Sequence, residues 1–94
     1  MNRDEALTLL RERIRTLRDL SYTELLRYLN DATCDEVIAP SGQRYQIEVG
    51  AMWADQRSSD LLVFASIDDG SFRWSFTPLV QDFIIRLDGT FVGE

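Results

Sequence analysis

Two adjacent carboxylates, Asp68 and Asp69, stand beside Gly70 in the stretch SIDDGSFRW and could carry out chemistry. Two carboxyl groups held close together could act as a general acid and base, or they could bind a divalent cation. They could also form a turn, because Asp-Gly between two alternating segments is a strong β-hairpin signal. Since consecutive residues of a strand point to opposite faces, we predict a turn here, and neither a catalytic pair nor a metal site.

The amino-acid composition excludes several classes of chemistry. All ten basic residues are arginine, and the chain contains neither lysine nor histidine. Imidazole bases, imidazole metal ligands, Schiff bases and P-loops are therefore excluded. Cys34 is the only cysteine, which excludes an intramolecular disulfide and a multi-thiolate metal cage and predicts a reduced thiol in the cytoplasm. We expect no cofactor and no metal, and we assign no catalytic residue.

The charge is distributed unevenly along a chain of net charge −6. Residues 1–34 hold six arginines and six acids, whereas residues 35–94 hold four arginines and ten acids. Binding to nucleic acid needs a basic patch, and the arginines of residues 11–18 are interleaved with acids, so we predict no nucleic-acid partner. The N-terminus is charged, and no segment approaches the ~20 apolar residues of a membrane span, which predicts a cytoplasmic protein with no membrane partner.

The N-terminal third has the pattern of two helices. Apolar residues recur every three or four positions and predict an amphipathic helix over about residues 3–20. Asn2 is its expected N-cap, with Glu5 reaching back to the Asn2 amide. Ser21 and Glu24 have the spacing of a capping box, which predicts a second helix over about residues 22–30.

From Glu36 onward the apolar period changes to two, as in strands. The pattern predicts strands at about residues 36–39, 43–54, 61–68, 72–77 and 83–92. Gly42 and Gly70 mark turns between them, and Asp88-Gly89 is expected to turn a final short hairpin. The chain is therefore predicted to be a single α+β domain over residues 1–94. Two N-terminal helices pack on one face of an antiparallel sheet of four to five strands, connected as a hairpin meander.

The candidate binding site follows from this alternation. Met52, Leu62 and Phe64 fall on the sheet face opposite the main core, and Asp68 and Asp69 are their candidate acidic neighbours. An apolar patch of this kind needs a cover. One possibility is that the tail from Pro78 to Val92 folds across it with Phe83, Ile85 and Phe91, and the other is that a partner chain binds there.

The second half of the chain resembles a group of small uncharacterised bacterial α+β proteins. The resemblance rests on SIDDG at 66–70, PL at 78–79, DFI at 82–84 and DGTFVGE at 88–94, with RYQIEV at 44–49. It implies a compact α+β domain. It brings no assigned activity, so no functional residue is transferred from it.

Two hypotheses for function remain. The first is a small, acidic, non-enzymatic protein-interaction module, which binds a basic protein in the manner of immunity proteins or forms a homodimer. The second is a small-ligand binder or enzyme that uses carboxylates, arginine and Tyr22, Tyr28 and Tyr45 in a cleft. An enzyme should show a pocket on which several polar groups converge, whereas a binding module should show an apolar patch with an acidic rim.

Overall fold

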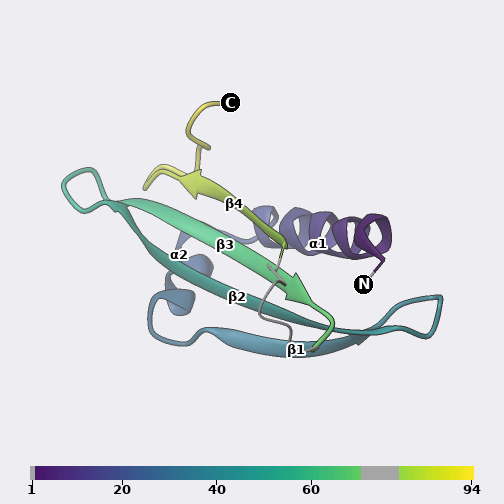
Figure 1. Cartoon of the computed structure of the whole chain (residues 1–94). Coiled ribbons are helices and arrows are strands. Elements are labelled where there is room, and N and C mark those ends of the chain that lie inside the picture. Colours follow the sequence, from purple (N-terminus) through teal and green to yellow (C-terminus); the bar gives the residue numbers. More distant parts are fainter. Residues whose placement is uncertain (1, 71–78) are drawn as a thin grey trace.

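The structure is a computed structural model of the chain, and it describes residues 2–70 and 79–94. The elements follow in the order α1 (Arg3–Arg18), α2 (Tyr22–Leu25), the 3₁₀ helix η1 (Leu26–Leu29), β1 (Thr33–Ile38), β2 (Arg44–Asp55), β3 (Asp60–Asp68) and β4 (Leu79–Ile85). The strands form one antiparallel sheet in the order β1-β2-β3-β4, with the helices on one side of it (Figure 1). The predicted α+β class, with N-terminal helices and an antiparallel sheet, is confirmed.

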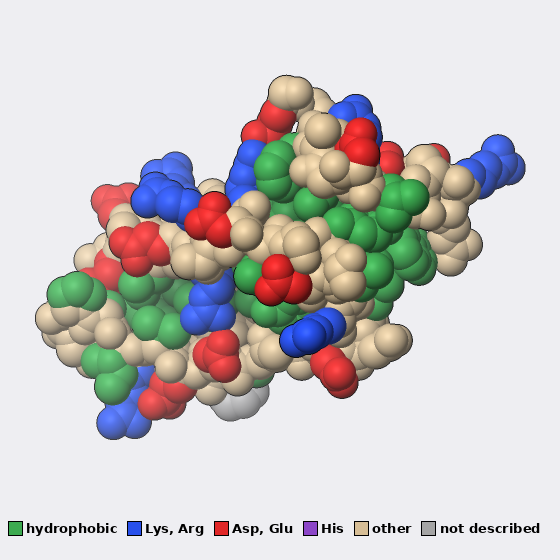
Figure 2. Space-filling view, turned by 180° about the vertical axis from the view of Figure 1, so that it is seen from behind, with side chains coloured by type: hydrophobic (Ala, Val, Ile, Leu, Met, Phe, Trp, Pro, Cys, Tyr) green, Lys and Arg blue, Asp and Glu red, His purple; other side chains and the backbone are tan. Residues whose placement is uncertain are grey.

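Helix α1 supplies the apolar layer that covers the sheet. Its residues Ala6, Leu10, Ile14 and Leu17 recur at helical spacing, are buried, and pack on β3 and β4. On its other side, Figure 2 shows arginine and acidic side chains interspersed over the surface. The helix ends at Arg18, slightly before the predicted end.

The N-terminus of α1 is tied to β2. Asn2 is the N-cap as predicted, because its Oδ1 accepts a hydrogen bond from the Glu5 amide at 3.1 Å. The Glu5 side chain does not reach back to Asn2. Its Oε1 accepts hydrogen bonds from the hydroxyls of Tyr45, at 3.0 Å, and Ser41, at 2.7 Å. Tyr45 is fully buried, so this contact fixes the start of α1 over the sheet.

We expect Tyr45→Phe to remove part of the loss of stability that occurs at high pH. Burial and the hydrogen bond to Glu5, followed by the charges of Glu5 and Asp69, raise the pKa of Tyr45. A phenol with a raised pKa in the folded state contributes stability below the pKa of unfolded tyrosine, and this contribution is lost as the pH rises through the folded value. Urea denaturation of both proteins on either side of about pH 10 measures the effect. An identical alkaline decline in the two proteins would contradict it, and the absence of lysine keeps ammonium groups out of this range.

The second predicted helix, over residues 22–30, is only partly helical. The capping box is present, since the Ser21 Oγ accepts from the Glu24 amide and the Glu24 carboxylate accepts from the Ser21 amide, each at 3.1 Å. One α-helical turn follows and then tightens into η1. Tightening of this kind is common at helix ends, and here Asn30 and Asp31 donate their amides back to the carbonyl of Arg27.

The first three strands lie close to their predicted positions. β1 begins three residues early, at Thr33, while β2 and β3 differ from the prediction by one residue at their ends. The turn between β1 and β2 is the predicted one. The Ala39 amide donates to the Gln43 carbonyl at 2.9 Å, and Gly42 has the positive φ of +89° that the turn requires.

The C-terminal strand prediction is wrong in its position. The expected strand 83–92 is replaced by β4 at Leu79–Ile85, and the chain then turns through residues 86–90. The Asp88-Gly89 turn itself is present, with Gly89 at φ +88° and an isolated bridge that pairs Phe91 with Ile85. The other expected strand, 72–77, lies outside the described residues.

The core lies between the helices and one face of the sheet. Within the part of the chain that the structure describes, it contains sixteen buried residues: Ala6, Leu10, Ile14, Leu17, Tyr22, Leu25, Ala39, Tyr45, Ile47, Val49, Leu61, Val63, Ala65, Ile67, Phe83 and Ile85. Every strand residue among them points to the helix side. No helix in residues 2–70 and 79–94 has the length and apolar character needed to cross a membrane.

Candidate functional site

The sheet has a second face, opposite α1, which we call the outer face. Because side chains alternate along each strand, the antiparallel registers fix which residues share it. They are Cys34, Glu36, Ile38, Arg44, Gln46, Glu48, Gly50, Met52, Leu62, Phe64, Ser66, Asp68, Val80, Asp82 and Ile84.

The outer face carries an apolar patch at the end where β2 turns into β3. Met52, Leu62 and Ile84 lie side by side across three strands. Phe64 occupies the next row, opposite Gly50. We call these residues, Met52, Leu62, Phe64 and Ile84, the apolar patch. Met52 is 53% exposed, and Val80, near the patch, is 55% exposed.

Gly50 allows the ring of Phe64 to lie across the neighbouring strand. A Cβ added at Gly50 would sit 2.6 Å from the nearest ring carbon of Phe64. Any larger residue at position 50 would therefore push the ring outward. The bare backbone of β2 thus gives the patch a flat aromatic surface.

Acidic side chains replace apolar ones toward the other end of the outer face. Asp82 lies opposite Phe64, and Glu48 lies opposite Ser66 in the next row. Glu36 and Asp68 lie one row further from the apolar patch, on either side of Gln46. Arg44 is the single basic residue among the outer-face residues given above, and its Nη1 lies 3.6 Å from the Glu36 carboxylate. Glu48, Asp68 and Asp82 therefore give the face a net negative charge.

The predicted site residues divide between the two faces. Met52, Leu62 and Phe64 come together as expected, and Asp68 shares their face at its acidic end. The Oδ1 of Asp68 accepts a hydrogen bond from the Gly70 amide at 2.7 Å, so this carboxylate forms part of a turn. Asp69 follows on the helix side, where its charge acts on buried Tyr45.

Sequence reasoning did not include several outer-face residues in the candidate site. Ile84 extends the apolar patch, and Glu48 and Asp82 border it. The described part of the tail, residues 79–94, does not fold across the apolar patch, because β4 joins the edge of the sheet instead. Phe83 and Ile85 point into the helix-side core, and Phe91 packs edge-on against Phe83 at a centroid distance of 5.6 Å.

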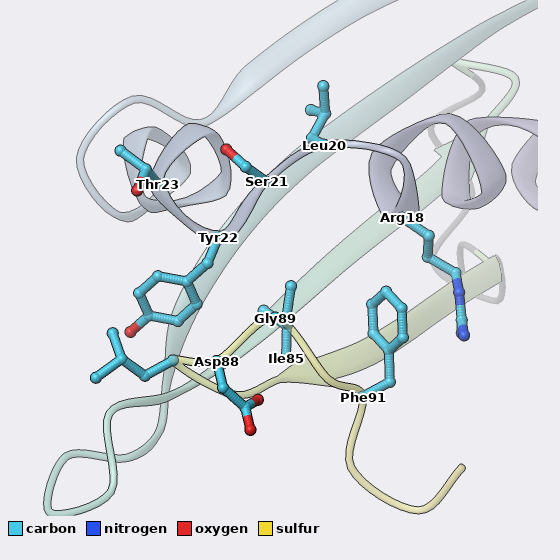
Figure 3. Close-up of a pocket in the computed structure, with 10 residues that line it drawn as sticks. Arg18, Leu20, Ser21, Tyr22, Thr23, Ile85, Asp88, Gly89 and Phe91 are labelled. Atoms are coloured by element: carbon cyan, nitrogen blue, oxygen red, sulfur yellow. The ribbon is translucent and has the colours of Figure 1, made fainter.

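A groove of about 400 Å³ lies between the end of α1, the start of α2 and the turn after β4. Figure 3 shows the rings of Tyr22 and Phe91 on either side of it, with Ile85 between them. Arg18 and Asp88 also line it. A small-ligand site, as in the second hypothesis, would lie in this groove.

The charged groups of the groove already hold the fold together. The Arg18 guanidinium donates to the Glu94 carboxylate and lies 4.2 Å from the centroid of the Phe91 ring. Asp88 Oδ1 accepts from the amide of Thr90 at 2.9 Å and from its hydroxyl at 2.6 Å, and these bonds lower the Asp88 pKa.

The tyrosines of the second hypothesis do not converge on this groove. The Tyr22 hydroxyl donates to the Ser59 carbonyl at 2.6 Å. Tyr45 contacts Glu5 at the opposite end of α1, which is about 24 Å long at 1.5 Å per residue. A ligand that recruited the Tyr22 hydroxyl would break a contact that positions α2.

No family model, curated protein or solved structure matches the chain. Within residues 2–70 and 79–94, no three Asp, Glu or Cys residues are grouped in a way that could hold a metal ion. The outer face is the surface on which both the apolar patch and the acidic rim of the first hypothesis are found.

Proposed function

We propose that the protein is a small acidic interaction module that binds a protein, either another chain or a second copy of itself, through the outer face of its sheet. No chemical step on the partner is part of this proposal. The proposal includes a cytoplasmic location, where a single reduced cysteine is expected.

The observation that carries the proposal is the composition of the outer face. Among residues 2–70 and 79–94, five large hydrophobic residues are exposed, and three of them, Ile38, Met52 and Val80, lie there. Met52 belongs to the apolar patch at one end of the face, Glu48 and Asp82 border that patch, and Ile38 lies at the other end, opposite Arg44. Protein interfaces commonly have such an apolar centre and polar rim, because apolar burial supplies affinity while charges select the partner.

Cys34 offers a direct test, because it is the only cysteine, is exposed, and pairs with Glu48 on the outer face. A photo-crosslinker attached to Cys34 should form an adduct with the bound protein in extracts of the producing cell. Mass spectrometry then distinguishes a second copy from another chain. Substitution Met52→Ser should reduce the yield of this adduct, since it weakens the apolar patch without touching the core.

The matched control moves the crosslinker to the other side of the molecule. In the variant Cys34→Ser with Arg11→Cys, the label is placed on the exposed side of α1. This variant should not form the same adduct. An adduct of equal yield from both positions, or none from Cys34, would refute the proposal.

A further inference from the structure

We propose, on the basis of the function proposed above, that the outer face binds a segment of a different protein that is apolar at one end and basic at the other. Apolar side chains of that segment lie over the apolar patch, and its Lys or Arg side chains lie over Glu48, Asp82 and Asp68. The proposal therefore assigns a chemical class to the partner and excludes a second copy of this chain.

The first reason is the separation of apolar and acidic residues along β2 and β3. On β3 the outward side chains change from Leu62 and Phe64 to Ser66 and Asp68. The neighbouring positions follow the same gradient, from Met52 to Glu48 on β2. Leu62 and Asp68 are six residues apart, or about 20 Å along a strand. A matching segment has its apolar and basic residues at opposite ends over this length.

The second reason is the sign of the charge. Among the described residues of β1 to β4, four acids and one arginine lie on the outer face, and the arginine, Arg44, is already close to Glu36. The whole chain carries a net charge of −6. A second copy would bring the same acidic surface and the same net charge, and like charges at an interface oppose association. A basic partner gains both contact energy and faster encounter.

The test uses two synthetic helical peptides of about 14 residues, a length that spans ~20 Å. One peptide carries leucines at one end and lysines at the other, and the second has glutamate in place of every lysine. Fluorescence anisotropy should show binding of the lysine peptide alone, with an affinity that falls as salt is added.

Charge-neutral substitutions locate the binding site. Glu48→Gln with Asp82→Asn should weaken binding of the lysine peptide about five-fold, since each surface ion pair contributes modestly. The matched control, Glu12→Gln with Asp19→Asn, removes the same charge from exposed positions on the helix side and should change the affinity less than about two-fold. Met52→Ser should also weaken binding of the lysine peptide, as measured by fluorescence anisotropy.

The outcomes separate this inference from the function on which it rests. Equal binding of the two peptides, or a Cys34 adduct with a second copy of the chain, would overturn the basic partner and leave the outer face as the binding surface. Equal loss from the Glu48/Asp82 and Glu12/Asp19 variants would show that the peptide responds to net charge alone, which also overturns it. No effect of Met52→Ser on either peptide binding or the adduct would overturn both proposals.

Discussion

Leu61→Ala is expected to lower the free energy of unfolding by about 3 kcal/mol, and Leu62→Ala by less than about 1 kcal/mol. The two residues are consecutive in β3, so the substitutions remove the same atoms from one strand and differ in the face that they affect. Leu61 is 0% exposed beneath the helices, where alanine leaves a cavity. Leu62 lies on the outer face and is partly exposed. Urea denaturation followed by circular dichroism measures both values.

This pair also tests whether the outer face is available to a partner. Truncation of a side chain that is exposed to solvent in the isolated protein lowers the free energy of unfolding only slightly. If Leu62→Ala destabilised the isolated protein as strongly as Leu61→Ala, a part of the same chain would have to cover the apolar patch. That result would contradict the proposed function before any partner is sought.

The two faces of β2 and β3 could be predicted because alternation is a local property. Each strand has apolar residues at every second position on the helix side, so the pattern identifies both the strand and its buried face. Met52, Leu62 and Phe64 were assigned to the opposite face by the same argument. Their assignment needed no knowledge of which strands are neighbours.

Which outer-face residues lie opposite one another could not be predicted, because this depends on the register between neighbouring strands. Asp55 pairs with Asp60, but Trp53 pairs with Leu61, so Ala54 is an extra residue in β2. Without this bulge, Leu62 would lie opposite Trp53 and not opposite Met52. A slip of one residue exchanges the two faces of a strand, so the apolar patch depends on Ala54.

The position of β4 was mispredicted for a different reason. Leu79, Phe83 and Ile85 point toward the helices, while Val80 and Ile84 point outward. With apolar residues on both faces, a period of two does not show where the strand begins or ends. The Asp-Gly turn was recognised because its signal lies in two residues. The contribution of β4 to the candidate site could be seen only after its pairing with β3 was known.

Arg18→Ala is expected to lower the free energy of unfolding by about 1.5 kcal/mol. The guanidinium stacks on the Phe91 ring and lies 5.7 Å from the Phe83 centroid, so it holds the segment after β4 against the end of α1. Its side chain is 32% exposed, and solvent therefore screens its ion pair with Glu94. Arg15→Ala, at an exposed position of the same helix, is the control and should cost less than about 0.5 kcal/mol.

The pH dependence of this effect separates stacking from the ion pair. The hydrogen bond and the charge of Arg18 lower the pKa of Glu94, so the pair contributes stability above the pKa of an unfolded glutamate and loses it as the pH falls through the folded value. The difference between wild type and Arg18→Ala should therefore shrink in acid, while the part due to packing on Phe91 remains. Glu94→Gln should remove only the acid-sensitive part. If the difference in the free energy of unfolding between wild type and Arg18→Ala stayed constant with pH, the whole effect would come from the contact with Phe91. The aromatic contact alone would then hold the C-terminal turn against α1.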